Sequence, residues 1–230
     1  MTVWNLQELR NEVERKYGRA HRDTFNQSLN SVVQRKEFAK YHYSEAKRLL
    51  AAATADHSAP GELMMLLFGG TDESIAFNQA RFQAAAHITS CVQDIHAIAD
   101  ILAHTVYFAL GMNLDASTAL KPRQIGMTEV IRKVPSALIR QLLTDLTNHD
   151  GFRYISALNN HSKHRSIVDT PYTIDLTSVP EPSGLQFAAF TYDNQHHAER
   201  WAMPTLDEEF GRQSALIIGI GQTLNSTLLT

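Results

Sequence analysis

The segment that most constrains the fold is 74–112, SIAFNQARFQAAAHITSCVQDIHAIADILAHTVYFALGM, because neither proline nor glycine interrupts it before Gly111. A helix of this length would extend for about 55 Å at roughly 1.5 Å per residue. Apolar residues occur on nearly every face of its helical wheel, which is the pattern of a helix surrounded by others. We therefore expect a mainly α-helical protein built around this central helix.

Helical patterns also flank the central segment. An amphipathic pattern covers 3–17, and a run rich in alanine, leucine and charged residues covers 22–56 until SAPGE at 58–62 ends it. Residues 128–148 predict another helix or two, with Pro135 in a first turn. Together with the central segment, these patterns predict a helical bundle of five to six helices.

A small antiparallel β insertion is predicted before the last helix. YTIDLTS at 172–178 alternates apolar and polar residues with the period of a strand, and DNQ at 193–195 is a turn sequence. We expect two or three strands over about 167–203, as an elaboration of a single helical-bundle domain that covers 1–230. After them, TLDE at 205–208 matches a capping box and predicts the start of the final helix.

Bulk composition excludes several classes of protein. The formal net charge of −3 argues against a surface that coats nucleic acid along its whole length. Cys91 is the single cysteine, so no intrachain disulfide is expected and a reducing compartment is the default. The N-terminal sequence MTVWNLQELRNEVERK is charged, and no window is apolar and long enough for a membrane span. We therefore expect a cytoplasmic protein with no membrane partner and no cofactor.

The candidate functional residues gather in NNHSKHRSIV at 159–168. Two asparagines, two histidines, a lysine and an arginine fall within seven positions of this stretch. It lies in the most basic part of the chain, since 121–168 carry eight lysines and arginines against three acids. No GxSxG, Walker, HExxH or paired CxxC motif is present, which argues against ordinary serine hydrolases, P-loop enzymes and zinc fingers. The stretch is therefore the best candidate for a local anion-binding site.

A helical wheel separates the side chains of this stretch. Asn159 falls on the apolar face that Phe152 and Ile155 define, whereas Asn160 and His164, one turn apart, point largely away from it. A buried amide needs hydrogen-bond partners, so Asn159 is expected to meet polar groups of another helix. The simpler interpretation is a solvated basic helix end that complements the helix dipole.

The central helix offers a polar stripe that contains His96, Asp100 and His104 at spacing i, i+4, i+8. A buried carboxylate without a cationic partner would be costly or would take up a proton. We therefore expect Asp100 to face the cationic cluster at 161–165.

Three interpretations of the stripe remain open: a polar seam that fixes helix register, a catalytic or nucleotide-contacting group, and a metal site. The two stripe histidines are separated by about 12 Å along the helix, so they cannot bind one ion by themselves. A metal site would need Asp100 and one of these histidines together with His161 or His164.

A long helix with HAIADILAHTVYFALG, followed by a helix with ALNNHSKHRSIV, resembles the HEPN superfamily of bacterial and archaeal helical bundles. The resemblance covers 75–168, and the last helix would complete the bundle. It implies a metal-independent endoribonuclease of a toxin–antitoxin or antiphage system. It also implies a dimer in which two copies of the motif form one cleft.

The motif of that superfamily is an arginine, a polar residue and, after a gap of four to six residues, a histidine. By position, His164 matches the histidine and Asn160 the polar residue. Asn159 stands where the arginine would bind the scissile phosphate, and a neutral amide lacks that charge. Lys163 or Arg165 would then have to supply it.

The leading hypothesis is a dimeric HEPN-like protein that binds or cleaves RNA or nucleotides, with His164 as acid and base and Asp100 orienting the cluster. The residues assigned to the site are, for catalysis, Asn159, Asn160, His164 and Asp100 and, for RNA phosphates, His161, Lys163 and Arg165. The alternative is a non-enzymatic dimeric interaction module for an antitoxin or another protein partner. A third hypothesis is a metal-dependent enzyme that uses His96, Asp100 and His104.

Overall fold

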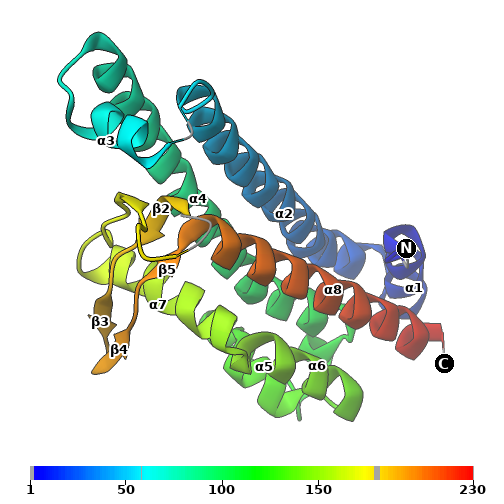
Figure 1. Ribbon diagram of the computed structural model, residues 1–230. Helices are drawn as coiled ribbons and strands as arrows, with labels where there is room; N and C mark the ends of the chain where they lie inside the picture. The colour runs from blue at the N-terminus through cyan, green and yellow to red at the C-terminus, as the bar shows by residue number, and fades with distance from the viewer. Residues whose placement is uncertain (1–2, 58, 179–181, 230) are drawn as a thin grey trace. The chain divides into compact units, whose positions relative to one another are not determined.

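The computed structural model describes residues 3–57, 59–178 and 182–229, and it confirms a mainly helical protein with a small antiparallel β region before the last helix (Figure 1). The α-helices, in chain order, are α1 (Leu6–Tyr17), α2 (Arg19–Ala53), α3 (Pro60–Phe68), α4 (Asp72–Ala109), α5 (Met127–Lys133), α6 (Ala137–Asn148), α7 (Asp150–His164) and α8 (Ala202–Leu229). Two short 3₁₀ turns are η1 (Met112–Leu114) and η2 (Pro122–Gln124). The strands are β1 (Tyr172–Ile174), β2 (Ser183–Phe187), β3 (Phe190–Tyr192), β4 (Gln195–His197) and β5 (Arg200–Trp201).

The described ranges contain eight α-helices, more than the five to six expected. The SAPGE stretch is more than a break, because Pro60 within it starts α3 and the Glu62 carboxylate accepts a hydrogen bond from the Ala59 N–H, 3.0 Å away. Pro135 lies between α5 and α6, so the predicted first-turn position was wrong. The hydroxyl of Ser136 caps α6 instead, accepting from the N–H of Ile139.

The capping box predicted at 205–208 was also wrong. Helix α8 begins at Ala202, directly after β5, so Thr205 already lies inside the helix. Pro204 occupies the first turn, where its missing N–H has no intrahelical partner to lose. The helix therefore starts without a capping side chain at Thr205.

The chain divides into two compact units. Unit 1 comprises Met1–Lys36, Ile95–Arg153 and Glu209–Thr230, and unit 2 comprises Glu37–Asp94 and Tyr154–Glu208. Helices α2, α4, α7 and α8 each contribute residues to both units, and the five strands all belong to unit 2.

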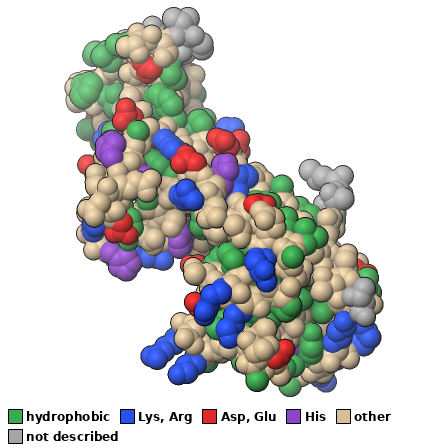
Figure 2. All heavy atoms as spheres, turned by 90° about the horizontal axis from the view of Figure 1, so that it is seen from below, with side chains coloured by type: hydrophobic (Ala, Val, Ile, Leu, Met, Phe, Trp, Pro, Cys, Tyr) green, Lys and Arg blue, Asp and Glu red, His purple; other side chains and the backbone are tan. Residues whose placement is uncertain are grey.

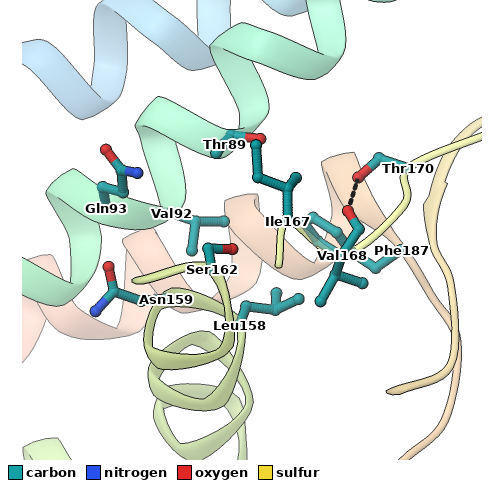
Figure 3. Close-up of a pocket in the computed structure, with 10 residues that line it drawn as sticks. All are labelled: Thr89, Val92, Gln93, Leu158, Asn159, Ser162, Ile167, Val168, Thr170 and Phe187. Atoms are coloured by element: carbon teal, nitrogen blue, oxygen red, sulfur yellow. Dashed lines mark hydrogen bonds between the residues drawn. The ribbon is translucent and has the colours of Figure 1, made fainter. Parts of the chain in front are cut away.

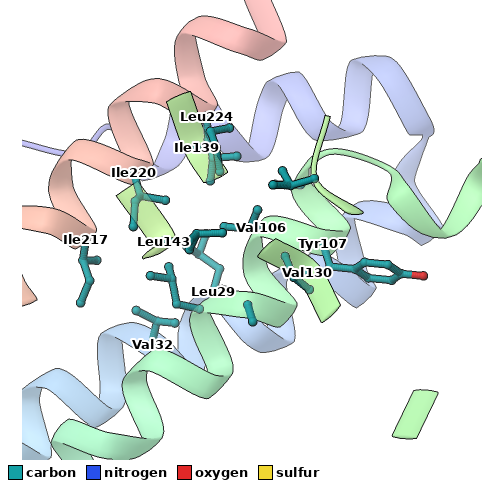
Figure 4. Packing of buried hydrophobic residues seen from close by; sticks show 14 of the residues in the cluster. Leu29, Val32, Val106, Tyr107, Val130, Ile139, Leu143, Ile217, Ile220 and Leu224 are labelled. Atoms are coloured by element: carbon teal, nitrogen blue, oxygen red, sulfur yellow. The ribbon is translucent and has the colours of Figure 1, made fainter. Parts of the chain in front are cut away.

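The core of unit 1 is mainly aliphatic and, over the described residues, draws on seven α-helices, α1, α2 and α4 to α8 (Figure 4). Each fully buried leucine, isoleucine or valine contributes about 1.5–3 kcal/mol through removal of apolar surface from water. Tyr107 is buried with them, and its hydroxyl accepts a hydrogen bond from the Leu120 N–H at 2.9 Å. The labelled core residues are Leu29, Val32, Val106, Tyr107, Val130, Ile139, Leu143, Ile217, Ile220 and Leu224.

Gly221 marks the place where α8 packs against Trp4. A Cβ added to Gly221 would lie 2.2 Å from Cδ2 of the indole, whereas a Cβ on Gly219 would meet nothing within 4 Å. We expect Gly221→Ala to lower the free energy of unfolding by about 1–3 kcal/mol through overpacking. The matched control Gly219→Ala should raise it by about 0.5–1 kcal/mol, because alanine favours a helix. Urea denaturation of both variants checks this, and equal shifts would contradict it.

Unit 2 contains the β region. The described residues contain five short strands, more than the two or three expected. Strands β1, β2 and β5 form one antiparallel sheet with β2 in the centre, and β3 and β4 form a hairpin. Asp193 and Asn194 connect the hairpin with φ angles of 47° and 62°, which is the geometry of a two-residue turn with a primed twist. The predicted DNQ turn is therefore confirmed.

Helices α2 and α4 pack against each other within unit 2. The Cys91 thiol donates to the Ala39 carbonyl oxygen, and the Nδ1 atoms of His42 and His87 lie 2.8 Å apart. Burial raises the pKa of Cys91 to about 12, so the side chain stays a thiol rather than a nucleophilic thiolate. Cys91 is thus a core residue, as its apolar context indicates.

Candidate functional site

The predicted site forms the last turn of α7 and the loop that follows, and it packs on the β3–β4 hairpin. The His161 ring contacts the rings of Phe190 and Tyr192, with centroids 5.5 and 6.4 Å apart. Arg165 donates from Nη1 to the Thr191 carbonyl oxygen at 3.0 Å, and its guanidinium carbon lies 4.9 Å from the Tyr192 ring centroid. The hairpin therefore holds both a histidine and an arginine of the cluster.

The tautomer of His161 follows from its hydrogen bond. Its Nδ1 lies 2.6 Å from the Ser166 carbonyl oxygen. A carbonyl oxygen only accepts, so Nδ1 carries the proton and Nε2 of the neutral ring carries the lone pair. A ring held in this way is oriented to accept a proton at Nε2.

His164 and Lys163 remain exposed at the end of the helix. Residues three apart on a helix are neighbours, with Cβ atoms about 5–6 Å apart, so His164 lies beside His161 on the same turn. The prediction that His164 points away from the core is confirmed. The site thus presents two histidines at neighbouring positions of one helix and an exposed ammonium group.

Asn159 is buried, as the helical wheel predicted, with 1% of its surface exposed. Its Nδ2 donates to Oδ1 of Asn160 at 3.3 Å, and Asn160 donates in turn to the Ser156 hydroxyl at 3.4 Å. The Asn159 Oδ1 atom has no hydrogen-bond partner among the described residues. The expectation that Asn159 hydrogen-bonds to another helix was therefore wrong, since its partner is Asn160 on the same helix. Its burial also keeps it from touching a substrate directly.

A cavity of about 10 Å³ adjoins Asn159 (Figure 3). Thr89, Val92 and Gln93 of α4 face Ser162 of α7 across it. A space of this size holds about one water molecule, which is too small for a nucleotide. The ligand-binding part of the cluster is therefore its exposed side.

Asp100 is not buried, so the expectation that it needs a cation from 161–165 was wrong. Its side chain is 63% exposed, and Oδ2 lies 3.7 Å from Nδ1 of His96 on the same helix. Asp100 belongs to unit 1 and the cluster to unit 2. The error has a physical cause, because the many alanines of α4 count as apolar on a wheel yet cost little to expose. Water solvates the carboxylate, and its role in orienting the cluster has no structural support.

The alternative metal site is incomplete. His96 stacks on Phe152, with ring centroids 5.9 Å apart, and His104 is partly buried further along α4. Over the ranges that the structure describes, no group of three or more His, Cys, Asp or Glu side chains is arranged to hold a metal ion. His96, Asp100 and His104 therefore do not converge on one ion.

The sequence of unit 2 is acidic overall. It carries about twice as many acidic as basic side chains, while seven of the eleven histidines also belong to it. Figure 2 shows histidines and basic groups as local clusters among acidic and neutral atoms. A long polyanion would be repelled, so the site suits a short ligand better than an extended nucleic acid.

Comparison of the chain with protein-family models, with curated proteins and with solved structures finds no match. Within the described ranges, no helix has the length and apolar character needed to cross a membrane.

Sequence reasoning missed the hairpin residues that organise the site. Thr191, Tyr192 and Asp193 hold Arg165, with Asp193 Oδ1 3.7 Å from the guanidinium Nη2. The DNQ turn indicated a hairpin, but no local pattern indicates that it packs against the end of α7.

A second missed feature is an exposed apolar surface around α3. Figure 2 shows apolar side chains gathered in this part of unit 2. On α3, Phe68 is 81% exposed and Met65 is 65% exposed, and Ile75 is 64% exposed near the start of α4. Large exposed apolar groups that cluster in this way commonly mark protein contacts.

Proposed function

We propose that unit 2 binds a short RNA strand or a nucleotide at the end of α7, and that it cleaves RNA by acid–base catalysis without a metal ion. The observation that carries the proposal is the pair of adjacent histidines. His161 is held through Nδ1 by the Ser166 carbonyl oxygen, and His164 is exposed three residues further along the helix. This pairing supports a division of labour between a proton acceptor and a proton donor.

RNA cleavage by this route needs a base that removes a proton from the attacking hydroxyl and an acid that gives a proton to the leaving oxygen. In the proposed step, Nε2 of His161 removes the proton from the ribose 2′-hydroxyl, and the 2′ oxygen attacks phosphorus. The bond from phosphorus to the 5′ oxygen breaks, and protonated His164 gives its proton to that leaving oxygen. The products are a 2′,3′-cyclic phosphate and a free 5′-hydroxyl. Histidine suits both roles because imidazole titrates close to neutral pH.

The phosphate needs a compensating positive charge. Lys163 is exposed beside the two histidines, and Arg165 is held by the Thr191 carbonyl oxygen and the face of Tyr192. These two side chains replace the arginine that the HEPN motif would place at Asn159. Fixed cations stabilise the extra charge of the transition state without having to reorganise.

The asparagines take indirect roles in this proposal. Asn160 accepts from Asn159 and donates to Ser156, so its amide is held against the helix. We assign Asn159 and Asn160 to positioning the last turn of α7.

The test is cleavage of short single-stranded RNAs by the purified protein in excess EDTA, followed by analysis of the product ends. We expect cleavage that leaves 2′,3′-cyclic phosphates and that EDTA does not reduce. An oligonucleotide with 2′-deoxyribose at the scissile position should resist, because it lacks the attacking hydroxyl. Failure to cleave a diverse set of RNAs would remove the proposal.

A second candidate function is self-association through the α3 surface. The apolar side chains of Met65 and Phe68 face solvent, and the same patch on a second copy would be complementary to it about a two-fold axis. We expect the wild-type protein to have the mass of a dimer by light scattering and Phe68→Asp to have that of a monomer. Ile167→Asp, at an exposed apolar residue elsewhere in unit 2, should remain a dimer. A monomeric wild-type protein would end this candidate.

A further inference from the structure

Unit 2 contains an open groove that the proposed cleavage site does not use. It lies between α4 and the segment 169–171, and its volume of about 440 Å³ is that of a small-molecule site. Arg81 and Phe82 line it from α4, and Asp169 lines it from the segment that follows α7.

The groove is built on fixed backbone. Arg81 and Phe82 lie within a long helix. The Asp169 carbonyl oxygen accepts from the Ala188 N–H, and the Pro171 carbonyl oxygen accepts from the Gln186 N–H, both at 2.9 Å. These bonds extend the β1–β2 pairing to Asp169, so its side chain starts from an ordered position.

The two charged groups of the groove have no side-chain partner among the described residues, whereas the Thr170 hydroxyl donates to the Val168 carbonyl oxygen at 3.2 Å. Neither the Arg81 guanidinium nor the Asp169 carboxylate forms a hydrogen bond or ion pair with another described residue. Phe82 is 69% exposed, and it lines the groove. A cation, an anion and an aromatic ring therefore line the same groove, and the cation and the anion do not form an ion pair with each other.

We infer that this groove binds a guanine nucleotide. The phosphate pairs with Arg81, whose planar guanidinium matches phosphate oxygens. The base stacks on the exposed ring of Phe82. The Asp169 carboxylate accepts from the adjacent N1–H and N2–H groups of guanine. Adenine presents a donor beside an acceptor on that edge, so a carboxylate pairs with it less well.

A guanine site in this groove deepens the proposed function, because it would select the base next to which an RNA strand is cleaved. Its biological role rests on that proposed function. Asp169 follows His164 by five residues, which limits the distance between their Cα atoms to about 18 Å. Binding of a mononucleotide contains no cleavage step, so the guanine site and the cleavage proposal can fail separately.

The experiment is titration calorimetry of the full chain with GMP, AMP and guanosine. We expect GMP to bind roughly tenfold more tightly than AMP. Arg81→Gln should weaken GMP roughly tenfold and leave guanosine unchanged, because only GMP carries the phosphate. Asp169→Asn should reverse the preference toward AMP, since an amide offers one donor and one acceptor. Phe82→Leu should weaken all three ligands.

The matched control is Phe38→Leu, which removes an exposed ring outside the groove and should leave every affinity unchanged. Circular dichroism of each variant verifies that it is folded. Absence of GMP binding at millimolar concentration, or equal affinity for GMP and AMP, would overturn the inference. GMP binding without RNA cleavage would support the nucleotide site and remove the catalytic proposal. RNA cleavage without GMP binding would support the catalytic proposal and remove the nucleotide site.

Discussion

Replacing Glu209 by alanine is expected to lower the free energy of unfolding by about 3–5 kcal/mol. Its side chain is 2% exposed in unit 1, and its carboxylate accepts from Arg212 at both oxygens, at 2.6 and 2.8 Å. Gln213 donates to the same carboxylate at 3.1 Å. Removing the carboxylate would leave a largely buried guanidinium without its counter-charge, and a buried unpaired charge is far costlier than a lost surface pair.

Arg212 also explains why the effect would spread beyond α8. Its guanidinium donates to the carbonyl oxygens of Asp145 and Leu146, at 3.0 and 2.8 Å. These carbonyls belong to the last turn of α6, where a helix leaves its acceptors unpaired. The Glu209 carboxylate therefore fixes the side chain that caps another helix.

The control for Glu209 is its neighbour in the sequence. Glu208 is exposed, so Glu208→Ala should change the free energy of unfolding by no more than about 0.5 kcal/mol. Glu209→Gln retains one carbonyl acceptor and should fall between the two. The measurement is chemical denaturation followed by circular dichroism. A loss below about 1 kcal/mol for Glu209→Ala would show that the network contributes little.

Glu209 also illustrates what the sequence could not reveal. Two glutamates stand side by side at 208 and 209, and only the phase of the helix decides which one is buried. The predicted capping box placed the helix start at Thr205 and drew attention to Glu208. Helix α8 instead begins at Ala202, directly after a strand. The rotation of α8 that buries Glu209 rather than Glu208 is therefore set by the β region and not by a signal in the helix sequence.

The central helix and the β region were predictable because their signals are local and long. An uninterrupted run from 74 to 109 leaves little choice but a helix, and DNQ between two alternating segments specifies a hairpin. Helix α3 was missed because its nine residues follow directly on proline and glycine signals that normally mark a loop.

The site was predictable only in part. Periodicity placed Asn159 in the interior and His164 outside, and the structure confirms both. Periodicity failed for Asp100, since alanine-rich faces do not distinguish burial from exposure. The orientation of His161 depends on Ser166 and on rings from the hairpin, which are contacts that no single-helix pattern contains.

The second large effect concerns the two histidines. We expect His161→Asn and His164→Gln each to lower kcat for RNA cleavage by about 10²–10⁴-fold with little change in KM. Asparagine retains a donor for the Ser166 carbonyl oxygen, so His161→Asn removes the proton acceptor while keeping the local fold. The control His57→Gln, at a histidine of unit 2 that pairs with Glu73 at 3.3 Å, should keep full activity.

The two substitutions should also differ in their pH dependence. A base must be deprotonated and an acid protonated, so the wild-type rate should fall at both low and high pH. His161→Asn should abolish the loss at low pH, and His164→Gln should abolish the loss at high pH. A structural role for either residue would lower the rate at every pH without removing one limb.

The double variant provides the decisive comparison. If the histidines act in one step, the combined substitution should lower kcat little further than the more damaging single one, because neither proton transfer is useful alone. Independent contributions would instead multiply, with a fall of about 10⁴-fold or more. Multiplicative losses would exclude a concerted pair, and full activity in either single variant would remove that histidine from the chemistry.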